Sequence, residues 1–92
     1  MLEIAGYTTD GKMVIKGIFR FFETTGLPLD IIVDQITVND CVPSWYDYFL
    51  EATAAGIPPE RVKSRMEEVI LDVFGRKYWT EVSKRLEKFF NV

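Results

Sequence analysis

The 92-residue sequence contains no histidine and a single cysteine, Cys41. Histidine is the commonest general base and the commonest transition-metal ligand in proteins, so its absence argues against most catalytic-triad and metal-centre chemistry. One cysteine cannot form an intrachain disulfide, which excludes a secreted, disulfide-stapled scaffold. Because its neighbours Asn39 and Asp40 are not cationic, we interpret Cys41 as a packing residue rather than a nucleophile.

Long apolar runs and phosphate-binding loops are also missing. No stretch approaches the roughly 18 consecutive apolar residues of a membrane span. Residues 1–12 lack the basic segment and apolar run of a secretory signal. The spacing of Gly6 and Gly11 fits neither a P-loop nor a dinucleotide-binding fingerprint. We therefore expect a cytoplasmic protein that does not associate with membranes and is not a nucleotide enzyme.

The remaining candidates for chemistry are carboxylates. Asp30 and Asp34 lie four residues apart and would share one face of a helix, where oxygen ligands could hold a hard cation. Asp30 is better explained by its favourable interaction with a helix N-terminus, and Asp34 by exposure to solvent. The sequence therefore predicts no metal site, no cofactor and no catalytic residue, and we expect the protein not to be an enzyme.

Charge is unevenly distributed along the chain, whose net charge is −3. Residues 1–56 hold three basic and eight acidic side chains, while residues 57–92 hold eight basic and six acidic ones, so the two parts carry −5 and +2. This difference favours attraction between the two parts, within one chain or across a dimer. The net acidity argues against non-specific coating of DNA, because such binding depends mainly on neutralising phosphates.

The two C-terminal segments are the clearest helices. Pro59 suits a first helical turn, and apolar residues then recur at helical spacing as far as Val73. Gly75 follows where a residue with positive φ would end this helix. A second amphipathic segment runs from Arg76 to Phe90, and the short connection predicts that the two helices form a hairpin or cross at a steep angle.

Two further helices are expected upstream. Ser44 and Asp47 form a variant of the capping box, so a helix should run from Ser44 to about Ala55 and stop at Gly56. The apolar spacing from Leu29 to Ile36 also suits a helix. The segment also contains β-branched residues, which favour strands as well.

The N-terminal third allows two interpretations. Asp10-Gly11, between residues 2–9 and 12–22, is a hairpin signal. A helix from about Met13 is favoured here, with residues 1–10 as a loose arm or a short strand. Its evidence is a coherent apolar stripe, formed by Ile15, Ile18, Phe19 and Phe22. The predicted fold is a single all-α domain over residues 1–92, a compact bundle of about five short helices, with an α+β fold carrying an N-terminal hairpin as the alternative.

Aromatic side chains provide the strongest functional signal. The chain has thirteen of them, and the segment from Trp45 to Leu50 is apolar around most of a helix. Such a helix is either the central helix of the domain or is buried by a second copy. We predict a non-enzymatic interaction protein that forms a two-fold homodimer, with an unidentified protein as a further possible partner. The predicted interface residues are Trp45, Tyr46, Tyr48, Phe49, Trp79, Phe89 and Phe90.

The alternative is a small nucleic-acid-binding regulator. Basic residues crowd the C-terminal segments and could contact phosphates while a nearby ring stacks on a base. Acidic residues such as Glu81 and Glu87 lie among them, which is also the pattern of an ordinary solvated helix surface. The residues predicted for this contact are Arg76, Lys77, Lys84, Arg85 and Lys88.

Overall fold

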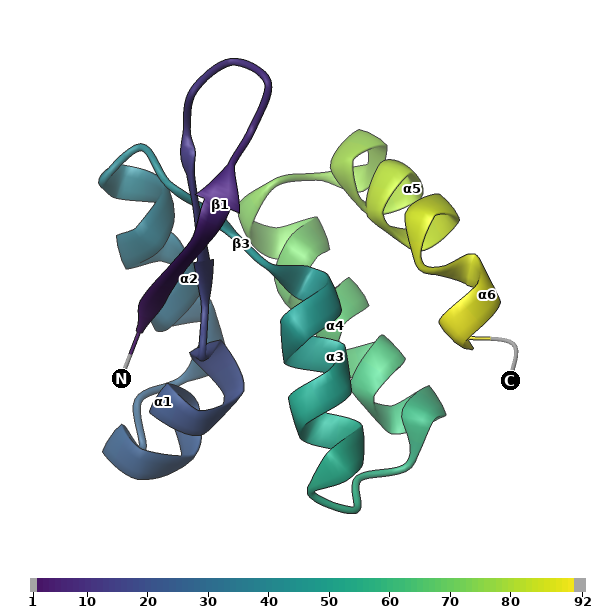
Figure 1. Ribbon diagram of the computed structural model, residues 1–92. Coiled ribbons are helices and arrows are strands. Elements are labelled where there is room, and N and C mark those ends of the chain that lie inside the picture. Colours follow the sequence, from purple (N-terminus) through teal and green to yellow (C-terminus); the bar gives the residue numbers. More distant parts are fainter. Residues whose placement is uncertain (1, 91–92) are drawn as a thin grey trace.

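The computed structural model describes residues 2–90 and begins with a small sheet (Figure 1). Strand β1 (Glu3–Tyr7) pairs antiparallel with β2 (Met13–Lys16), with Ile4 opposite Ile15 and a bulge between Ile4 and Gly6. Strand β3 (Val42–Pro43) adds to the other side of β2 in parallel. The strand order is β1-β2-β3, so β1 lies at one edge.

The hairpin takes up the first part of the helix that was predicted from about Met13: residues Met13–Lys16 form a strand and the helix begins only at Ile18, so the predicted start was wrong. The turn is closed by hydrogen bonds from the Thr8 backbone N–H to the Lys12 carbonyl at 2.8 Å and from the Lys12 N–H to the Thr8 hydroxyl at 2.9 Å. Gly17, with φ at 84°, then separates strand from helix. The apolar stripe was real, but its first member, Ile15, lies in β2, where pairing with β3 stabilises the extended backbone.

Six helices follow within the described part of the chain. Helices α1 (Ile18–Thr25) and α2 (Leu29–Val38) connect β2 to β3. The remainder is helical and is divided as follows: α3 (Trp45–Ala54), α4 (Pro59–Val73), α5 (Arg76–Arg85) and α6 (Glu87–Phe90). The fold is therefore mostly helical with a small sheet, which is the α+β alternative and not the all-α bundle.

The local signals located most of these helices correctly. The Ser44 hydroxyl accepts a hydrogen bond from the Asp47 backbone N–H at 3.4 Å and starts α3 as predicted. Gly75, with φ at 99°, separates α4 from α5. The last predicted helix is interrupted, because Leu86 has φ −99° and ψ 8° and leaves the helical conformation before α6 begins.

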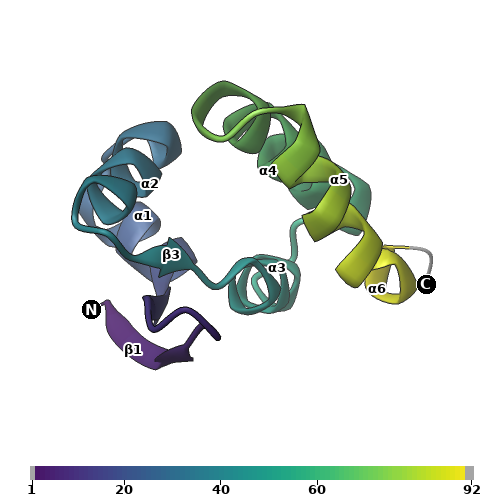
Figure 2. The ribbon, with the colours of Figure 1, turned by 90° about the horizontal axis from the view of Figure 1, so that it is seen from above.

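Helix α4 is the centre of the packing and contacts α2, α3, α5 and α6. Viewed from above, α1, α2 and β3 lie on one side and α4 and α5 on the other, with α3 between them (Figure 2). The buried apolar residues form one cluster, and its largest fully buried side chains are Ile18, Leu29, Val33, Met66 and Ile70. Among residues 2–90, none of the helices is both long enough and apolar enough to cross a membrane.

Candidate interaction surfaces

The fold brings the predicted aromatic residues together around α3. The rings of Trp45 and Tyr48 lie 6.1 Å apart between centroids, those of Phe49 and Phe90 5.3 Å, and those of Trp79 and Phe90 6.2 Å. The first two pairs meet edge to face, an arrangement that aromatic quadrupoles favour. The sequence therefore identified a true spatial cluster.

Four of these residues nevertheless offer no surface to a second chain. Trp45, Tyr48, Phe49 and Trp79 are all buried within the single chain. The reason is the position of α3, which packs between α1 on one side and α4 on the other. Their assignment to a partner interface has to be corrected, because intramolecular packing already encloses these four side chains.

The exposed remainder of this region is a small aromatic ridge, which we define as Tyr46, Leu50, Phe89 and Phe90. Tyr46 and Leu50 lie one turn apart on α3 and are exposed, while both phenylalanines are half-buried. The Tyr46 and Phe89 rings lie 4.9 Å apart. Lys88 sits 5.6 Å from the Phe89 ring centroid, so a cation lies beside the ridge.

A larger apolar surface lies on the opposite side of the molecule, and the sequence did not predict it. A groove of about 330 Å³ runs between β1 and α2 and is called here the β1–α2 groove. It exists because α2 packs mainly against β3 and α4, while β1 packs mainly against β2, so no element covers the space between them. Its walls are mainly aliphatic and include Leu2, Ile4, Ile15, Leu27, Ile31 and Ile36.

Four of the groove residues are exposed although they are apolar: Leu2, Ile4, Leu27 and Ile31. Ile31 carries the sequence signal that could have revealed the groove. The core-facing side of α2 is formed by Leu29, Ile32, Val33 and Ile36. Ile31 is therefore an apolar residue outside the core-facing side of an otherwise amphipathic helix. A second apolar side on a short helix indicates a second surface to be covered.

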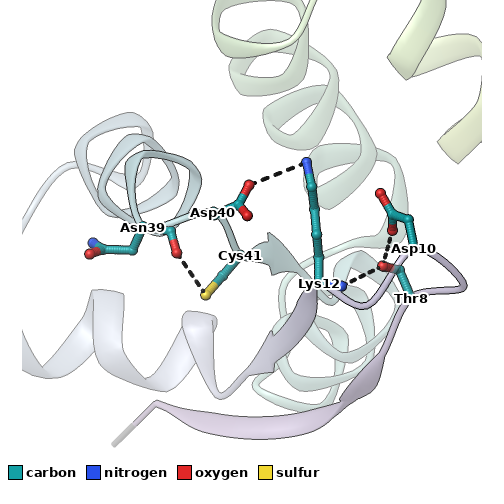
Figure 3. A network of polar contacts seen from close by, with 6 residues as sticks. All are labelled: Thr8, Asp10, Lys12, Asn39, Asp40 and Cys41. Atoms are coloured by element: carbon teal, nitrogen blue, oxygen red, sulfur yellow. Dashed lines mark hydrogen bonds and ion pairs between the residues drawn. The ribbon is translucent and has the colours of Figure 1, made fainter.

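A polar network links the hairpin turn to the connection between α2 and β3 (Figure 3). Lys12 in the hairpin turn pairs with Asp40 at 3.5 Å, in the connection between α2 and β3. The Cys41 thiol, which lines the groove, donates to the Asn39 carbonyl at 3.4 Å. In the turn itself, a hydrogen bond from the Thr8 hydroxyl lowers the pKa of Asp10. The Lys12–Asp40 ion pair thus joins the hairpin turn to the connection that follows α2.

A second cleft, of about 350 Å³, lies between β3, the start of α3 and α5. Within it the Trp45 indole N–H donates to the Tyr78 hydroxyl at 3.3 Å. Burial raises the pKa of Tyr78, and burial likewise raises the pKa of Tyr48 in the core. Both phenols are thus held in their neutral form well into the alkaline range.

The five predicted nucleic-acid contacts are all exposed on α5 and α6. Lys77 and Lys84 are seven residues apart and share the outer face of α5. Glu81 lies between them and is also exposed. The arrangement leaves basic side chains accessible without grouping them into a continuous positive surface, and nucleic-acid binding stays a prediction.

Comparison of the chain with family models, with curated proteins and with solved structures finds no match.

Proposed function

We propose that the chain is a non-enzymatic interaction module whose docking site is the β1–α2 groove. The observation that carries this proposal is the cluster of exposed aliphatic side chains around one cavity, on a chain whose other large apolar residues are mostly enclosed. Contiguous apolar surface of this kind marks interaction sites on soluble proteins. Covering each such side chain stabilises a complex by on the order of 1 kcal/mol, since about half of its surface is still available.

Self-association through the aromatic ridge is the second candidate. The exposed Tyr46 and Leu50, with Phe89 packed beside them, could meet the same residues of a second copy across a two-fold axis. Self-association through the ridge is the homodimer that the sequence predicts, but its contact surface consists of the exposed residues and not of the enclosed rings.

A matched pair of substitutions separates the two surfaces. Leu27 in the groove is 43% exposed and Leu50 on the ridge is 41% exposed, so an aspartate at either position removes similar apolar area and leaves the core intact. Light scattering across a concentration series reports self-association of the wild type. Dimers lost in Leu50→Asp alone support the ridge, and dimers lost in Leu27→Asp alone support a groove filled by a second copy.

Peptide selection tests the groove directly. Peptides selected from a random display library on the wild-type protein, with counter-selection on Leu27→Asp, should perturb the amide resonances around Ile4 and Ile31 in NMR spectra. Leu50→Asp should bind the same peptides normally. If selection produces no peptide whose binding depends on Leu27, the groove is not a docking site and this proposal fails.

The nucleic-acid alternative is supported by five accessible basic side chains. A gel shift across a salt series tests it, because contacts to phosphates must weaken steeply as salt rises. Lys77→Gln combined with Lys84→Gln should then reduce both the affinity and the salt slope. Absence of a shift at low salt would remove this alternative.

A further inference from the structure

A cavity of about 400 Å³ lies between α1, α3 and the first half of α4. Phe19 and Phe22 of α1 and Tyr48 of α3 form an aromatic side, and Arg61 and Arg65 of α4 form a basic side. Among residues 2–90, this cavity shares no lining residue with the β1–α2 groove. Its volume and its combination of apolar walls with a few polar groups are typical of small-molecule sites.

Two arginines lie one turn apart on the face of α4 that lines this cavity. Arg61 and Arg65 are both exposed. The three ion pairs within residues 2–90 all use other cations, so neither guanidinium is paired with a carboxylate there. Like charges at this spacing repel each other, and an anion bound between them removes the repulsion. The pair therefore favours an anionic ligand.

The Tyr48 hydroxyl is a second, independent sign of a ligand. Tyr48 is only 3% exposed, and its ring meets those of Phe19 and Trp45 edge to face, with centroids 5.8 and 6.1 Å away. Within residues 2–90 the side-chain hydrogen bonds around α3 leave its hydroxyl without a partner. Enclosed polar groups in proteins nearly always have one.

This hydroxyl is not sealed inside the core. In the described part of the chain, the fully buried side-chain oxygen without a hydrogen bond is Oε1 of Glu51, so the Tyr48 hydroxyl keeps some accessible surface. Tyr48 lines the cavity beside Arg65. Burial raises the pKa of Tyr48, while Arg65 lowers it and Glu23 raises it. Because burial dominates, the phenol stays protonated and can donate a hydrogen bond to a ligand.

Glu68 limits the charge that the cavity accepts. It follows Arg65 by three residues and also lines the cavity, so the lining holds two cations and one anion. A monoanion neutralises this excess of one positive charge. A phosphate monoester carries nearly two negative charges at pH 7 and would leave one of them beside the Glu68 carboxylate. The charges therefore favour a carboxylate over a phosphate.

We propose that this cavity binds a small organic carboxylate that carries an apolar ring or chain. The carboxylate lies between Arg61 and Arg65 and accepts a hydrogen bond from the Tyr48 hydroxyl. The apolar part packs against Phe19 and Phe22. This site goes beyond the proposed function, because it takes a small molecule and leaves the β1–α2 groove free.

The probe is naphthylacetate, which joins one carboxylate to an apolar ring system. Its controls are naphthylacetamide, which lacks the charge, acetate, which lacks the rings, and naphthyl phosphate, which adds a charge. In NMR titrations we expect naphthylacetate to bind at least roughly tenfold more tightly than each control, with the largest amide shifts at Tyr48 and residues 61–68. Equal binding of the amide, or tighter binding of the phosphate, would overturn the carboxylate assignment.

Variants of α4 test whether the cavity or the general charge of the helix attracts the probe. Arg61→Gln and Arg65→Gln should each weaken naphthylacetate roughly fivefold or more. Lys63→Gln is the matched control, because Lys63 lies on the same helix but over the Phe90 ring, 5.2 Å from its centroid, and outside the cavity. It should change the affinity less than about twofold. Equal losses in all three variants would overturn the proposed site.

Tyr48→Phe tests the hydroxyl, since it keeps the ring and its packing. It should weaken naphthylacetate roughly fivefold and reduce the preference for naphthylacetate over naphthylacetamide, because the hydrogen bond to a charged acceptor is the stronger one. A loss of folding alone would weaken both probes equally, and urea denaturation checks that the variant is folded. A preference unchanged in Tyr48→Phe would contradict the role of the hydroxyl.

Leu27→Asp separates this inference from the proposed function. Leu27 lines the β1–α2 groove and not this cavity, so the substitution should leave naphthylacetate binding unchanged. If Leu27→Asp abolishes binding, the probe occupies the groove and this inference fails. If the arginine variants lose the probe and Leu27→Asp retains it, the carboxylate site stands whatever the groove binds.

Discussion

The molecule has a hairpin side, formed by β1, β2 and α2, and an aromatic side, formed by α3, α5 and α6. Both sides are rich in apolar residues, but they differ in how far those residues are buried. On the aromatic side, rings from α3, α5 and α6 pack on one another, and both indoles are enclosed. On the hairpin side, aliphatic residues from β1, α2 and the loop before α2 surround a groove and stay exposed. The difference shows that the number of large apolar residues does not determine which of them remain available to a partner.

The difference in burial arises because helices pack over the aromatic side and leave part of the hairpin side uncovered. The long α4 contacts most of the other helices and closes the aromatic side. On the hairpin side the sheet has three short strands, and its edge strand has no helix packed closely beneath it. A surface left uncovered by the fold is therefore the better guide to function in this chain than aromatic content.

The largest expected effect compares the same residue type in the two environments. Ile70 on α4 is 0% exposed and Ile31 beside the groove is 46% exposed. Ile70→Ala should lower the free energy of unfolding by about 2–5 kcal/mol, because it leaves a cavity in a packed core. Ile31→Ala should change it by less than about 0.5 kcal/mol in urea denaturation. Similar losses of unfolding free energy for both variants would show that Ile31 is covered in the free protein, and would contradict the difference in burial between the two sides.

Alkaline pH should destabilise the aromatic side first. Burial raises the pKa of Tyr48 and Tyr78 above the ordinary value of 10.0, so the folded state holds these protons more tightly than the unfolded state. Their contribution to stability is complete below about pH 10 and is lost as the pH rises through the raised values. Urea midpoints measured between about pH 9 and about pH 11 should fall, and Tyr48→Phe should reduce the slope. A slope unchanged by this substitution would contradict the burial of the phenol.

The junction between the two sides depends on the cap of α3. Ser44→Ala removes the hydroxyl that accepts from the Asp47 N–H and should cost about 1 kcal/mol of unfolding free energy. Ser64→Ala, at an exposed position within α4, makes the same chemical change without a cap and should alter stability by less than about 0.5 kcal/mol. Equal effects in thermal denaturation would argue that the Ser44 hydroxyl contributes nothing specific.

The smallest effect is expected from the ion pair that links α1 to α3. Arg20 and Glu51 lie 3.2 Å apart, with side chains 74% and 21% exposed. A double-mutant cycle with Arg20→Gln and Glu51→Gln should give a coupling of about 0.5 kcal/mol that decreases with salt, because the guanidinium is well solvated. A coupling above about 2 kcal/mol would show that this link is buried and holds the two sides together more strongly than described.

Much of the fold followed from local signals in the sequence. The Ser44 cap and Gly75 identified the ends of helices correctly, because capping and positive φ depend on neighbouring residues. The hairpin was only the second choice, since Asp10-Gly11 and the apolar stripe gave conflicting signals. Pairing of Val14 with Val42, residues far apart in the chain, decided in favour of the strand. The aromatic cluster was predicted as a group, but its burial was not.

By itself, the sequence determined where most helices form, that α3 is apolar on nearly all sides, and that the N-terminal part carries excess acid. These properties depend on composition and on spacing within a few turns. Only the tertiary structure decided that Trp45, Tyr48 and Phe49 on α3 are enclosed by their own chain while Leu27 and Ile31 remain exposed. Whether an apolar face is covered depends on which distant segments pack against it, and the periodicity of that face contains no information about them.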